Sequence, residues 1–527
     1  MGDRYAKRIG LWDQLTRIAA LMLLLPLFQS TASADLLIKN VTLITGKTDH
    51  QRNIVSAKTG YLWIVAGKIH YAGSQRPKVP TTTPEFDGEG GFLLPGLIDS
   101  HVHLGQVPGI HLRDQERKKR LINVWQAWEP SAYLRYGFTS LIDLGEFNHD
   151  YVRQFYPTGL APRVFGVGQT VRQLDGYGHN FFTKPEAYRA LPNYLINHDQ
   201  ALPEHVDRRD HEPARLVANA KKEGGIAIKA FYEDGFSGVF PQLALPEIAQ
   251  LKALKKAADA AQLPVILHAT SIKGYQVAAD IGVDVIAHGL WHKEVGDFSQ
   301  PMPKTLTKDL FRQLSKNGTT VQPSLRVVLA EMESDRAYTP QSLASLPNEL
   351  CEFYLSPAAQ SHLEEGEELV ALLRQRAYVT ADSSLPALRS LFADRALTQL
   401  KGMQEAGIQF LFGTDTPTPT GAAVALPGRN AYLEMQAWTQ AGIPLDHLFL
   451  ALTDRNARQF KLKNLGRLEK GYLADLVLLR KNPLKEVSAY EEVQQVWIAG
   501  KPVLPTQVFN TDKTNSTIQQ NACGASF

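Results

Sequence analysis

The stretch Leu93–Gly105, LLPGLIDSHVHLG, places an apolar run directly before two histidines that one residue separates. On a strand, residues i and i+2 point to the same side, so the imidazoles of His101 and His103 can reach one cation. The same pattern also occurs in strands that face solvent. The pair alone therefore leaves two interpretations open, a buried strand that contains histidines or half of a metal site.

Further apolar runs of similar length follow along the chain, and most of them precede a helical stretch. This alternation predicts strand–helix units and a parallel sheet. The candidate strands are Gly96–Leu104, Thr139–Gly145, Arg163–Val171, Gly225–Phe231, Pro264–Thr270, Val283–Gly289, Thr319–Leu325 and Ile408–Asp415. Eight such strands predict an α/β fold of the (β/α)8 TIM barrel type, with its active site at the carboxyl ends of the strands.

Short alternating runs at both ends of the mature chain predict antiparallel strands. We expect residues 35–93 and 465–510 to form one small β-sandwich domain, and residues 94–464 to form the barrel. Insertions at 172–220 and 326–395 should wall or cover the pocket, and the composition of the second predicts helices. Residues 511–527 are expected to be a polar tail.

Residues 1–34 have the features of a secretory signal peptide: basic residues, the apolar run Ile18–Phe28, and the small residues Ala32 and Ala34. A membrane anchor is the alternative, but this run has about half of the roughly 20 apolar residues that span a bilayer. We therefore expect export to the periplasm or medium, cleavage near Ala34, and no stable membrane anchor.

Charge and cysteine content narrow the possible partners. The formal net charge is +3, from 56 Lys and Arg against 53 Asp and Glu, so nucleic acid is not expected as a partner. Cys351 and Cys523 either pair in an oxidising compartment or stay as buried thiols. They cannot form a thiolate zinc site alone, so any metal must be held by histidines and carboxylates. The sequence leaves open whether the chain forms a homo-oligomer.

Polar residues recur at the carboxyl ends of the predicted strands. Burying any of them unpaired would cost several kcal/mol, and convergence on metal ions would remove that cost for all of them together. For each residue separately, a core side chain satisfied by the backbone is the more common case. The residues are His101, His103, Lys229, His268, His288 and Asp415.

The motifs that carry these residues resemble the amidohydrolase superfamily and occur in its order. They are PGLIDSHVHL (95–104), IKAF around Lys229, ILHAT around His268, AHG (287–289), FGTD (412–415) and NAR…LGRLEKGYLADLVLL (456–479). A lysine on the fourth strand, where other branches have glutamate, is similar to the prolidase-like and imidazolonepropionase-like branch. The pair Gly178–His179 after the third strand adds to this likeness.

The resemblance implies a binuclear metal centre, most often of zinc. It also implies that CO2 carboxylates Lys229 to a carbamate that bridges the ions, since an ammonium repels cations and has no lone pair to donate. If Lys229 is instead a solvated lysine, the site is mononuclear and His288 is not a ligand. The ligands implied are His101, His103 and Asp415 for the first ion, and His268 and His288 for the second.

The expected reaction is hydrolysis of a C–N amide-type bond in a dipeptide, an N-acyl amino acid or a cyclic amide. A metal-bound hydroxide would attack, and Asp415 would act as general base and then acid. A mononuclear metal-dependent deaminase is the alternative enzyme. A non-catalytic protein that binds a ligand in the same barrel is the alternative of another class.

Four residues near the predicted mouth are candidates for substrate binding. Tyr232 and His179 could hydrogen-bond the reacting group, or Tyr232 merely packs. Arg172 and Arg326 could bind a substrate carboxylate in a bidentate way, or belong to structural ion pairs. The remaining histidines considered are expected in loops or on the surface, namely His205, His211, His292 and His447.

One segment departs from the family pattern. After the lysine of the fourth strand, relatives often carry a run of small residues rich in glycine. This chain has AFYEDGFSG there, with bulky Phe231 and Tyr232 and acidic Glu233 and Asp234. The substrate preference of prolidases therefore does not transfer directly.

Overall fold

A computed structural model describes the parts of the chain that form the fold. They are residues 35–48, 54–108, 110, 118–145, 161–235, 242–292, 302–332, 343, 346–356, 385–417 and 426–503. The predicted signal peptide, the polar tail and Cys523 lie outside them, so cleavage and the pairing of Cys351 stay predictions. Throughout the described part, each helix is too short or too polar to span a bilayer.

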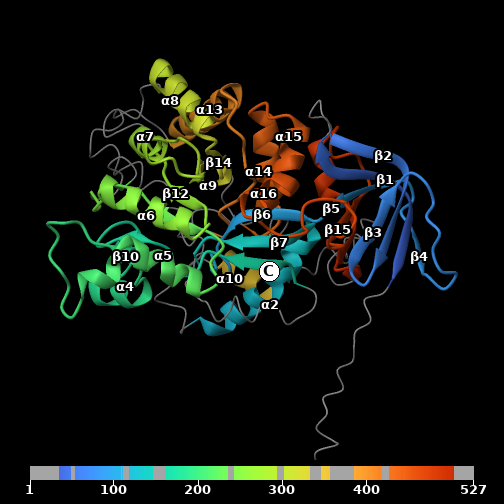
Figure 1. Cartoon of the computed structure of the whole chain (residues 1–527), viewed down its shortest axis with the longest axis horizontal. Coiled ribbons are helices and arrows are strands. Elements are labelled where there is room, and N and C mark those ends of the chain that lie inside the picture. The colour runs from blue at the N-terminus through green and yellow to red at the C-terminus, as the bar shows by residue number, and fades with distance from the viewer. Residues whose placement is uncertain are drawn as a thin grey trace, which may run out of the picture.

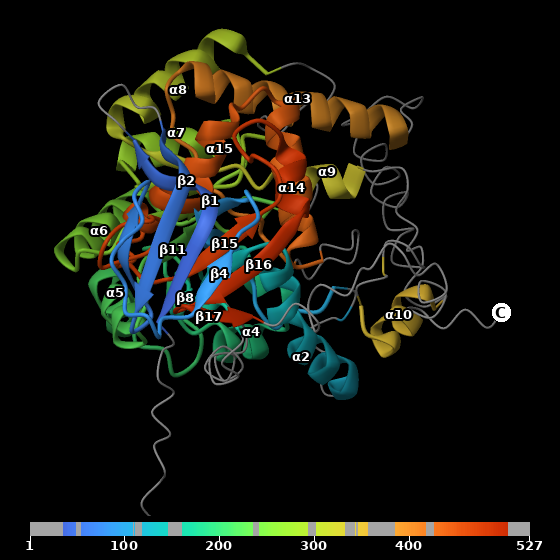
Figure 2. The ribbon, with the colours of Figure 1, turned by 90° about the vertical axis from the view of Figure 1, so that its right-hand side faces the viewer.

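One mixed sheet of eight strands combines the two ends of the chain, in the order β17-β16-β15-β5-β1-β2-β3, with β4 beside β1. Figures 1 and 2 show its blue N-terminal strands next to red C-terminal ones. A two-layered sandwich stays a prediction. The strands are β1 (Leu36–Thr48), β2 (Ile54–Val65), β3 (Lys68–Gly73), β4 (Glu85–Asp87), β5 (Phe92–Pro95), β15 (Leu476–Leu479), β16 (Val493–Ile498) and β17 (Lys501–Val503).

Strand β5 joins the two ends of the chain within this sheet. Leu93 lies opposite Leu43 of β1 in parallel register and opposite Leu478 of β15 in antiparallel register. All three side chains belong to one buried apolar cluster, which also contains Trp497 of β16. The Trp497 ring meets Phe86 of β4 edge to face, with ring centroids 5.2 Å apart. Burial of this cluster therefore depends on both ends of the chain.

Parallel strands form the centre of the molecule at seven of the eight predicted positions. Their residues are mostly buried on both faces, as continuous apolar runs predict for parallel sheets. One sheet contains β6 (Leu97–Val102), β7 (Phe138–Asp143) and β8 (Arg163–Gly166). The other contains β11 (Ile228–Phe231), β12 (Val265–His268), β13 (Val285–Ala287) and β14 (Thr320–Gln322).

The eighth predicted strand is a segment between β14 and β6 that makes isolated bridges. Phe410 bridges Val321 of β14, and Thr416 bridges Val102 of β6, both in parallel. On the opposite side, the Ile226 N–H donates to the Gly166 carbonyl, with 3.0 Å between N and O, and so connects β8 to the segment before β11. Backbone hydrogen bonds thus link the two parallel sheets and this segment at each junction.

Helices lie around the parallel strands (Figure 1). The described parts of both predicted insertions contain some of them: α4 and α5 in the first, α9, α10 and part of α13 in the second. Their bounds are α2 (Lys119–Arg135), α4 (Lys184–Ala190), α5 (Pro213–Lys222), α6 (Ile248–Ala260), α7 (Ile272–Ile281), α8 (Lys304–Asn317), α9 (Leu325–Met332), α10 (Asn348–Leu355), α13 (Leu385–Glu405), α14 (Arg429–Gln440), α15 (Leu445–Leu450) and α16 (Asn456–Gln459). Short elements complete the fold: β9 (Arg172–Gln173), β10 (Tyr194–Leu195), 3-10 turns at His179–Phe181, Arg208–His211 and Val487–Glu491, and a π-helical turn at Ala451–Arg455.

We expect Trp497→Ala to destabilise the protein by about 3–5 kcal/mol, because a large ring that is 1% exposed leaves a cavity between strands from both chain ends. Denaturant unfolding measures the loss. Leu202→Ala, at a side chain that is 43% exposed, should change stability by less than about 0.5 kcal/mol. Equal effects of the two substitutions would contradict the role assigned to the terminal sheet.

Candidate metal centre

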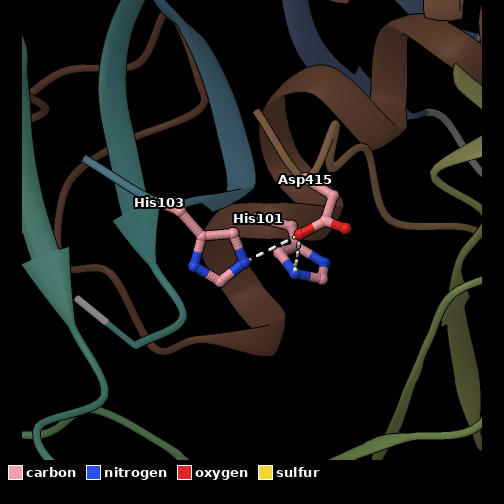
Figure 3. Close-up of side chains that lie close together, drawn as sticks. All are labelled: His101, His103 and Asp415. Atoms are coloured by element: carbon pink, nitrogen blue, oxygen red, sulfur yellow. Dashed lines mark hydrogen bonds and ion pairs between the residues drawn. The ribbon is translucent and has the colours of Figure 1, made fainter. Parts of the chain in front are cut away.

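Three of the predicted ligands meet around one carboxylate oxygen. The Nε2 atoms of His101 and His103 lie 2.9 Å and 2.7 Å from Oδ1 of Asp415 (Figure 3). Potential ligand atoms of the three residues all lie within 4.8 Å of one another. His101 is on β6, His103 follows that strand, and Asp415 ends the eighth predicted strand. The first and last predicted strands therefore bring these side chains together across the chain.

A buried carboxylate beneath the cluster fixes the two segments that carry it. Asp99 accepts hydrogen bonds from the N–H of His101 (3.2 Å), the N–H of Thr414 (3.1 Å) and the hydroxyl of Thr414 (2.7 Å). Asp143, at the end of β7, likewise accepts from the N–H groups of Leu104 (3.0 Å) and Gly145 (2.9 Å). The Gly145 carbonyl in turn lies 3.2 Å from Nδ1 of His103. Both histidines are therefore held by groups that the sequence analysis did not single out.

Two predicted ligands have backbone conformations that are rare for residues with a side chain. The φ angle is 60° at Asp415 and 79° at His288. Such conformations cost of order 1–3 kcal/mol each and persist where the surrounding structure imposes them, often at functional sites. Local sequence preferences do not predict this geometry.

His268 and His288 lie beside the first three ligands. The His288 ring centroid is 5.1 Å from that of His101 and 4.6 Å from that of His268. Nδ1 of His288 is 3.9 Å from Oδ2 of Asp415, the second oxygen of the shared carboxylate. The five side chains therefore form one continuous group.

Lys229 completes the group as a buried amine. The residue is 2% exposed, and its Nζ has no hydrogen-bond partner among the described residues. Burial lowers the pKa of Lys229 to about 7, although Asp415 acts to raise it. A solvated lysine, which the mononuclear alternative requires, does not agree with this position.

The ionisation of the cluster suits cation binding. Burial lowers the pKa of His101 to about 3 and also lowers those of His268 and His288, so these imidazoles are neutral and have a lone pair to donate. Burial acts to raise the pKa of Asp415, but His101 and His103 outweigh it and hold that pKa well below 3.8. The cluster combines one carboxylate with neutral ligands, a set that fits a divalent cation of the zinc type.

Unpartnered nitrogen atoms give a further test of the fit. In the described part of the chain, Nδ1 of His101, Nδ1 of His288 and Nζ of Lys229 are buried and have no hydrogen-bond partner. Leaving a buried polar group unsatisfied costs about 1–3 kcal/mol, and most native structures avoid it. A metal ion would take a lone pair from one nitrogen of each histidine, and carboxylation would add oxygen ligands to the buried amine, so the residues present fit a metal centre.

Residues that the sequence analysis did not assign surround His268. Its Nε2 lies 3.4 Å from Oε2 of Glu233, and the Tyr177 ring stacks on the imidazole at 4.9 Å between centroids. Tyr177 lies within residues 172–220, the first predicted insertion, which therefore places one side chain against His268. The sequence signal for Glu233 was its unusual acidic segment after Lys229, whereas nothing in the sequence pointed to Tyr177.

Arg172 is a buried cation close to this group. It is 6% exposed, its guanidinium donates to the Tyr177 carbonyl at 3.1 Å, and its Nε has no partner in the described regions. Its Cζ lies 4.2 Å from the centroid of the Phe231 ring. Burial lowers the pKa of Arg172 to about 10, which leaves it charged. Among the described residues no carboxylate forms an ion pair with it, as the structural alternative would require.

The other substrate candidates are engaged within the fold. The His179 ring accepts from the Asp175 N–H at Nδ1, and its Nε2 lies 3.2 Å from the Leu191 carbonyl. Tyr232 is 6% exposed and belongs to the main apolar cluster. The Nε of Arg326 donates to Asn430 at 3.2 Å. Arg172 combines a position near the cluster with a buried Nε that has no partner in the described regions.

His292 lies in the segment that follows β13, as expected of a loop residue, but it is not on the surface. His292 is 8% exposed, and burial lowers its pKa to about 4. Its backbone bridges Ser271, because the chain after β13 folds back against the end of β12. His205, in contrast, is exposed as expected.

Glu434 of α14 fixes the start of α9, where Arg326 lies. It accepts from the N–H groups of Leu325 (2.9 Å) and Arg326 (2.7 Å) and from the indole of Trp438 (2.8 Å). Burial raises the pKa of Glu434 to about 7 despite these donors. The Glu434 carboxyl group therefore anchors the start of the second insertion. The free-energy cost of burying this group rises with pH, because the unfolded state releases its proton first.

Comparisons with known proteins show which proteins this chain resembles. A family model described as "Amidohydrolase family" matches residues 380–504. The imidazolonepropionase of Aromatoleum aromaticum is 26% identical over 272 residues, which cover 48% of this chain and 62% of that protein. The match thus spans less than two thirds of that relative. The ochratoxinase of Aspergillus niger is 23% identical over 461 residues, which cover 82% of this chain and 80% of the relative.

Solved structures show the same fold. The crystal structure of A. niger ochratoxinase superposes with a TM-score of 0.61 at 19% identity, covering 89% of this chain and 95% of the other. The crystal structure of a Xaa-Pro dipeptidase with bound methionine gives a TM-score of 0.60 at 21% identity. The match covers 89% of this chain and 99% of the dipeptidase chain. At this level of identity the likeness concerns the fold alone.

We expect the stability of the protein to fall relative to a Glu434→Gln variant as pH rises from 4.5 to 7. In this window the unfolded state has released the proton of Glu434 and the folded state still binds it, so raising the pH favours unfolding. The relative loss should be about 3 kcal/mol, measured by denaturant unfolding in chelator. If the difference in unfolding free energy between wild type and Glu434→Gln does not change with pH, the burial of an ionisable Glu434 is contradicted.

Proposed function

We propose that this chain, which belongs to the prolidase-like and imidazolonepropionase-like branch of the amidohydrolase superfamily, is a metal-dependent hydrolase of C–N amide-type bonds. One observation carries the proposal: His101, His103 and Asp415 converge within 4.8 Å of one another, near a buried lysine whose Nζ has no hydrogen-bond partner among the described residues. A binding protein would need neither a shared carboxylate ligand nor that lysine.

We infer that the parallel strands close into a (β/α)8 barrel with the site at its carboxyl end. Support comes from the junctions: the Asp415 N–H donates to the His101 carbonyl at 2.7 Å, and the Leu411 N–H donates to the Val321 carbonyl at 2.9 Å. His268 ends β12, and His288 directly follows β13. The predicted ligands thus come from the strand ends where barrel enzymes place their active sites.

In the proposed centre, the six side chains would hold two divalent ions, most simply zinc. His101, His103 and Asp415 would bind one ion, and His268 and His288 the other. Lys229 would carry a carbamate between them. Bound ions of this kind lower the pKa of a water molecule and polarise a carbonyl group.

Lys229 has the properties that carboxylation requires. With a pKa of about 7, much of its amine is neutral near neutral pH and can attack CO2 through its lone pair. The new N–C bond and loss of one proton give a carbamate with two anionic oxygen atoms. This change converts a buried cation into an anion next to Asp415 and removes the unpartnered Nζ.

Asp415 is proposed to move the proton during hydrolysis. One of its oxygens faces both imidazoles, and the other is 3.9 Å from Nδ1 of His288. A carboxylate in this place can take the proton of the attacking water and then give it to the leaving nitrogen. The neutral histidines keep their positions and need not transfer protons.

Arg172 favours a substrate with a carboxylate group. A buried guanidinium with an unpartnered Nε is stabilised when an anion binds it in a bidentate way. The ring of Phe231 beside it offers an apolar surface. A dipeptide or an N-acyl amino acid has both a carboxylate for Arg172 and an apolar part for Phe231, and a dipeptide agrees with the printed name of the Xaa-Pro dipeptidase neighbour. A cyclic amide that lacks a carboxylate would leave Arg172 without an anion.

We expect Asp415→Asn to lower kcat by about 10²–10⁴-fold, the usual contribution of a positioned acid–base group, while the fold is retained. The assay is turnover of dipeptides and N-acyl amino acids by protein grown with zinc and bicarbonate. Arg172→Met should raise KM more than it lowers kcat on the same substrates. Unchanged turnover in Asp415→Asn would exclude the role given to that residue.

Metal analysis tests the centre itself. We expect two equivalents of transition metal per chain, and a mass increase of Lys229-containing protein equal to one CO2 under native conditions. Less than one equivalent in the wild-type protein would overturn the hydrolase proposal. One equivalent with an unmodified lysine would favour the mononuclear deaminase.

We also propose export of the chain, from the composition of its first 34 residues. N-terminal sequencing of protein from a periplasmic fraction should then begin at Asp35, after cleavage at Ala34. An intact N-terminus on protein that stays in the cytoplasm would contradict this proposal.

A further inference from the structure

We propose that Glu233 is a positioning residue for His268, holding one imidazole nitrogen so that the other faces the second metal ion. The inference rests on the proposed binuclear function and adds to it a residue outside the predicted ligand set. It also assigns a role to Glu233 in the acidic segment after Lys229, which departs from the family pattern.

The contact between the two side chains is buried. Oε2 of Glu233 lies 3.4 Å from Nε2 of His268, and the side chains are 2% and 5% exposed. Water therefore screens the pair little, and a carboxylate in this place acts strongly on the imidazole. The two residues follow or end neighbouring strands, β11 and β12, so the contact belongs to the parallel sheet and not to a loose loop.

Two further groups fix the Glu233 carboxylate. The hydroxyl of Thr270 donates to Oε2 at 2.6 Å, and the N–H of Gly235 donates to Oε1 at 3.1 Å. Thr270 is 0% exposed and lies two residues after His268. The carboxylate is thus oriented by the same chain segment as the imidazole that it faces.

The aromatic neighbours of His268 restrict its ring but do not choose its tautomer. Tyr177 stacks on the ring at an interplanar angle of 23°, and Phe231 lies at 33° with centroids 5.5 Å apart. A ring face does not accept an in-plane N–H, whereas the carboxylate does. We assign the proton of His268 to Nε2, on the side of Glu233, because this tautomer would keep the lone pair of Nδ1 for a cation.

A carboxylate behind a ligand histidine also raises the basicity of that ligand. Removal of such a partner typically costs 10–100-fold in metal affinity. A merely structural Glu233 would contribute to folding through Thr270 and Gly235, and its loss would not act on one ion selectively. The affinity for the second ion therefore distinguishes a Glu233 that positions His268 from a Glu233 that only stabilises the fold.

The experiment titrates metal-depleted full-length protein with Co²⁺ and follows the visible absorption of the bound ion, with total metal measured in parallel. In Glu233→Gln, which keeps the size and the acceptor for Thr270, we expect the second ion to bind 10–100-fold more weakly. The first ion, on His101, His103 and Asp415, should bind unchanged. Glu233→Asp should recover part of the loss, because it restores the charge.

Asp454→Asn is the matched control. Asp454 is also a buried carboxylate, but its ion pairs are with Arg458 at 2.8 Å and Arg467 at 2.6 Å. Both ions should bind to this variant as they do to the wild type. A loss of the second ion here as well would reduce the Glu233 effect to general destabilisation and overturn the inference.

Wild-type behaviour distinguishes the two proposals. If the wild type binds two ions and Glu233→Gln binds both with unchanged affinity, the positioning role is wrong and the hydrolase proposal stands. If the wild type does not bind two ions, the binuclear function itself fails. Should Glu233→Gln not fold, Thr270→Val must weaken the second ion by several-fold, and unchanged affinity in that variant overturns the inference.

Discussion

The buried carboxylate of Asp99 ties the first predicted strand to the last, and the metal-binding geometry depends on this link. It accepts hydrogen bonds from His101 and from two donors of Thr414, residues that are more than 300 positions apart in the chain. Burial raises the pKa of Asp99 to about 7, so the protein maintains an unfavourable group to make the contact. As a result, Nε2 of His101 lies 2.9 Å from Oδ1 of Asp415.

Electrostatic imbalance characterises the region around these strand ends. Lys229 Nζ and Arg172 Cζ lie 5.4 Å and 4.2 Å from the centroid of the same Phe231 ring, and both residues are buried. Within the described chain, Asp415 is the carboxylate that attracts Lys229, and Arg172 opposes it by lowering the lysine pKa. Carboxylation of the lysine and binding of an anionic substrate would each reduce this imbalance. These charges are consistent with the proposed carboxylation and the proposed anionic substrate.

The terminal sheet contributes to the site through the start of β6. The Gly96 N–H donates to the Asp475 carbonyl at 2.8 Å, and the Asp475 carboxylate pairs with Arg163 of β8 at 2.5 Å. A side chain at position 96 would collide with Thr139 of β7, since a Cβ there would lie 1.9 Å from its hydroxyl oxygen. Glycine therefore allows β6 to approach β7 where the chain passes from the terminal sheet to the parallel strands. The C-terminal segment supports the strand that carries both histidines.

The positions of seven parallel strands and the candidate metal ligands can be read from the amino-acid sequence. Apolar runs buried on both faces are continuous in sequence, and polar residues at their ends stand out against them, as at His268 and Asp415. Tertiary structure alone decided how these ends meet. The contact of Glu233 with His268, the stacking of Tyr177 and the burial of His292 depend on segments that the fold brings together, and no local period encodes them. The positive φ angles of Asp415 and His288 likewise run against local preference, because the surrounding hydrogen bonds impose them.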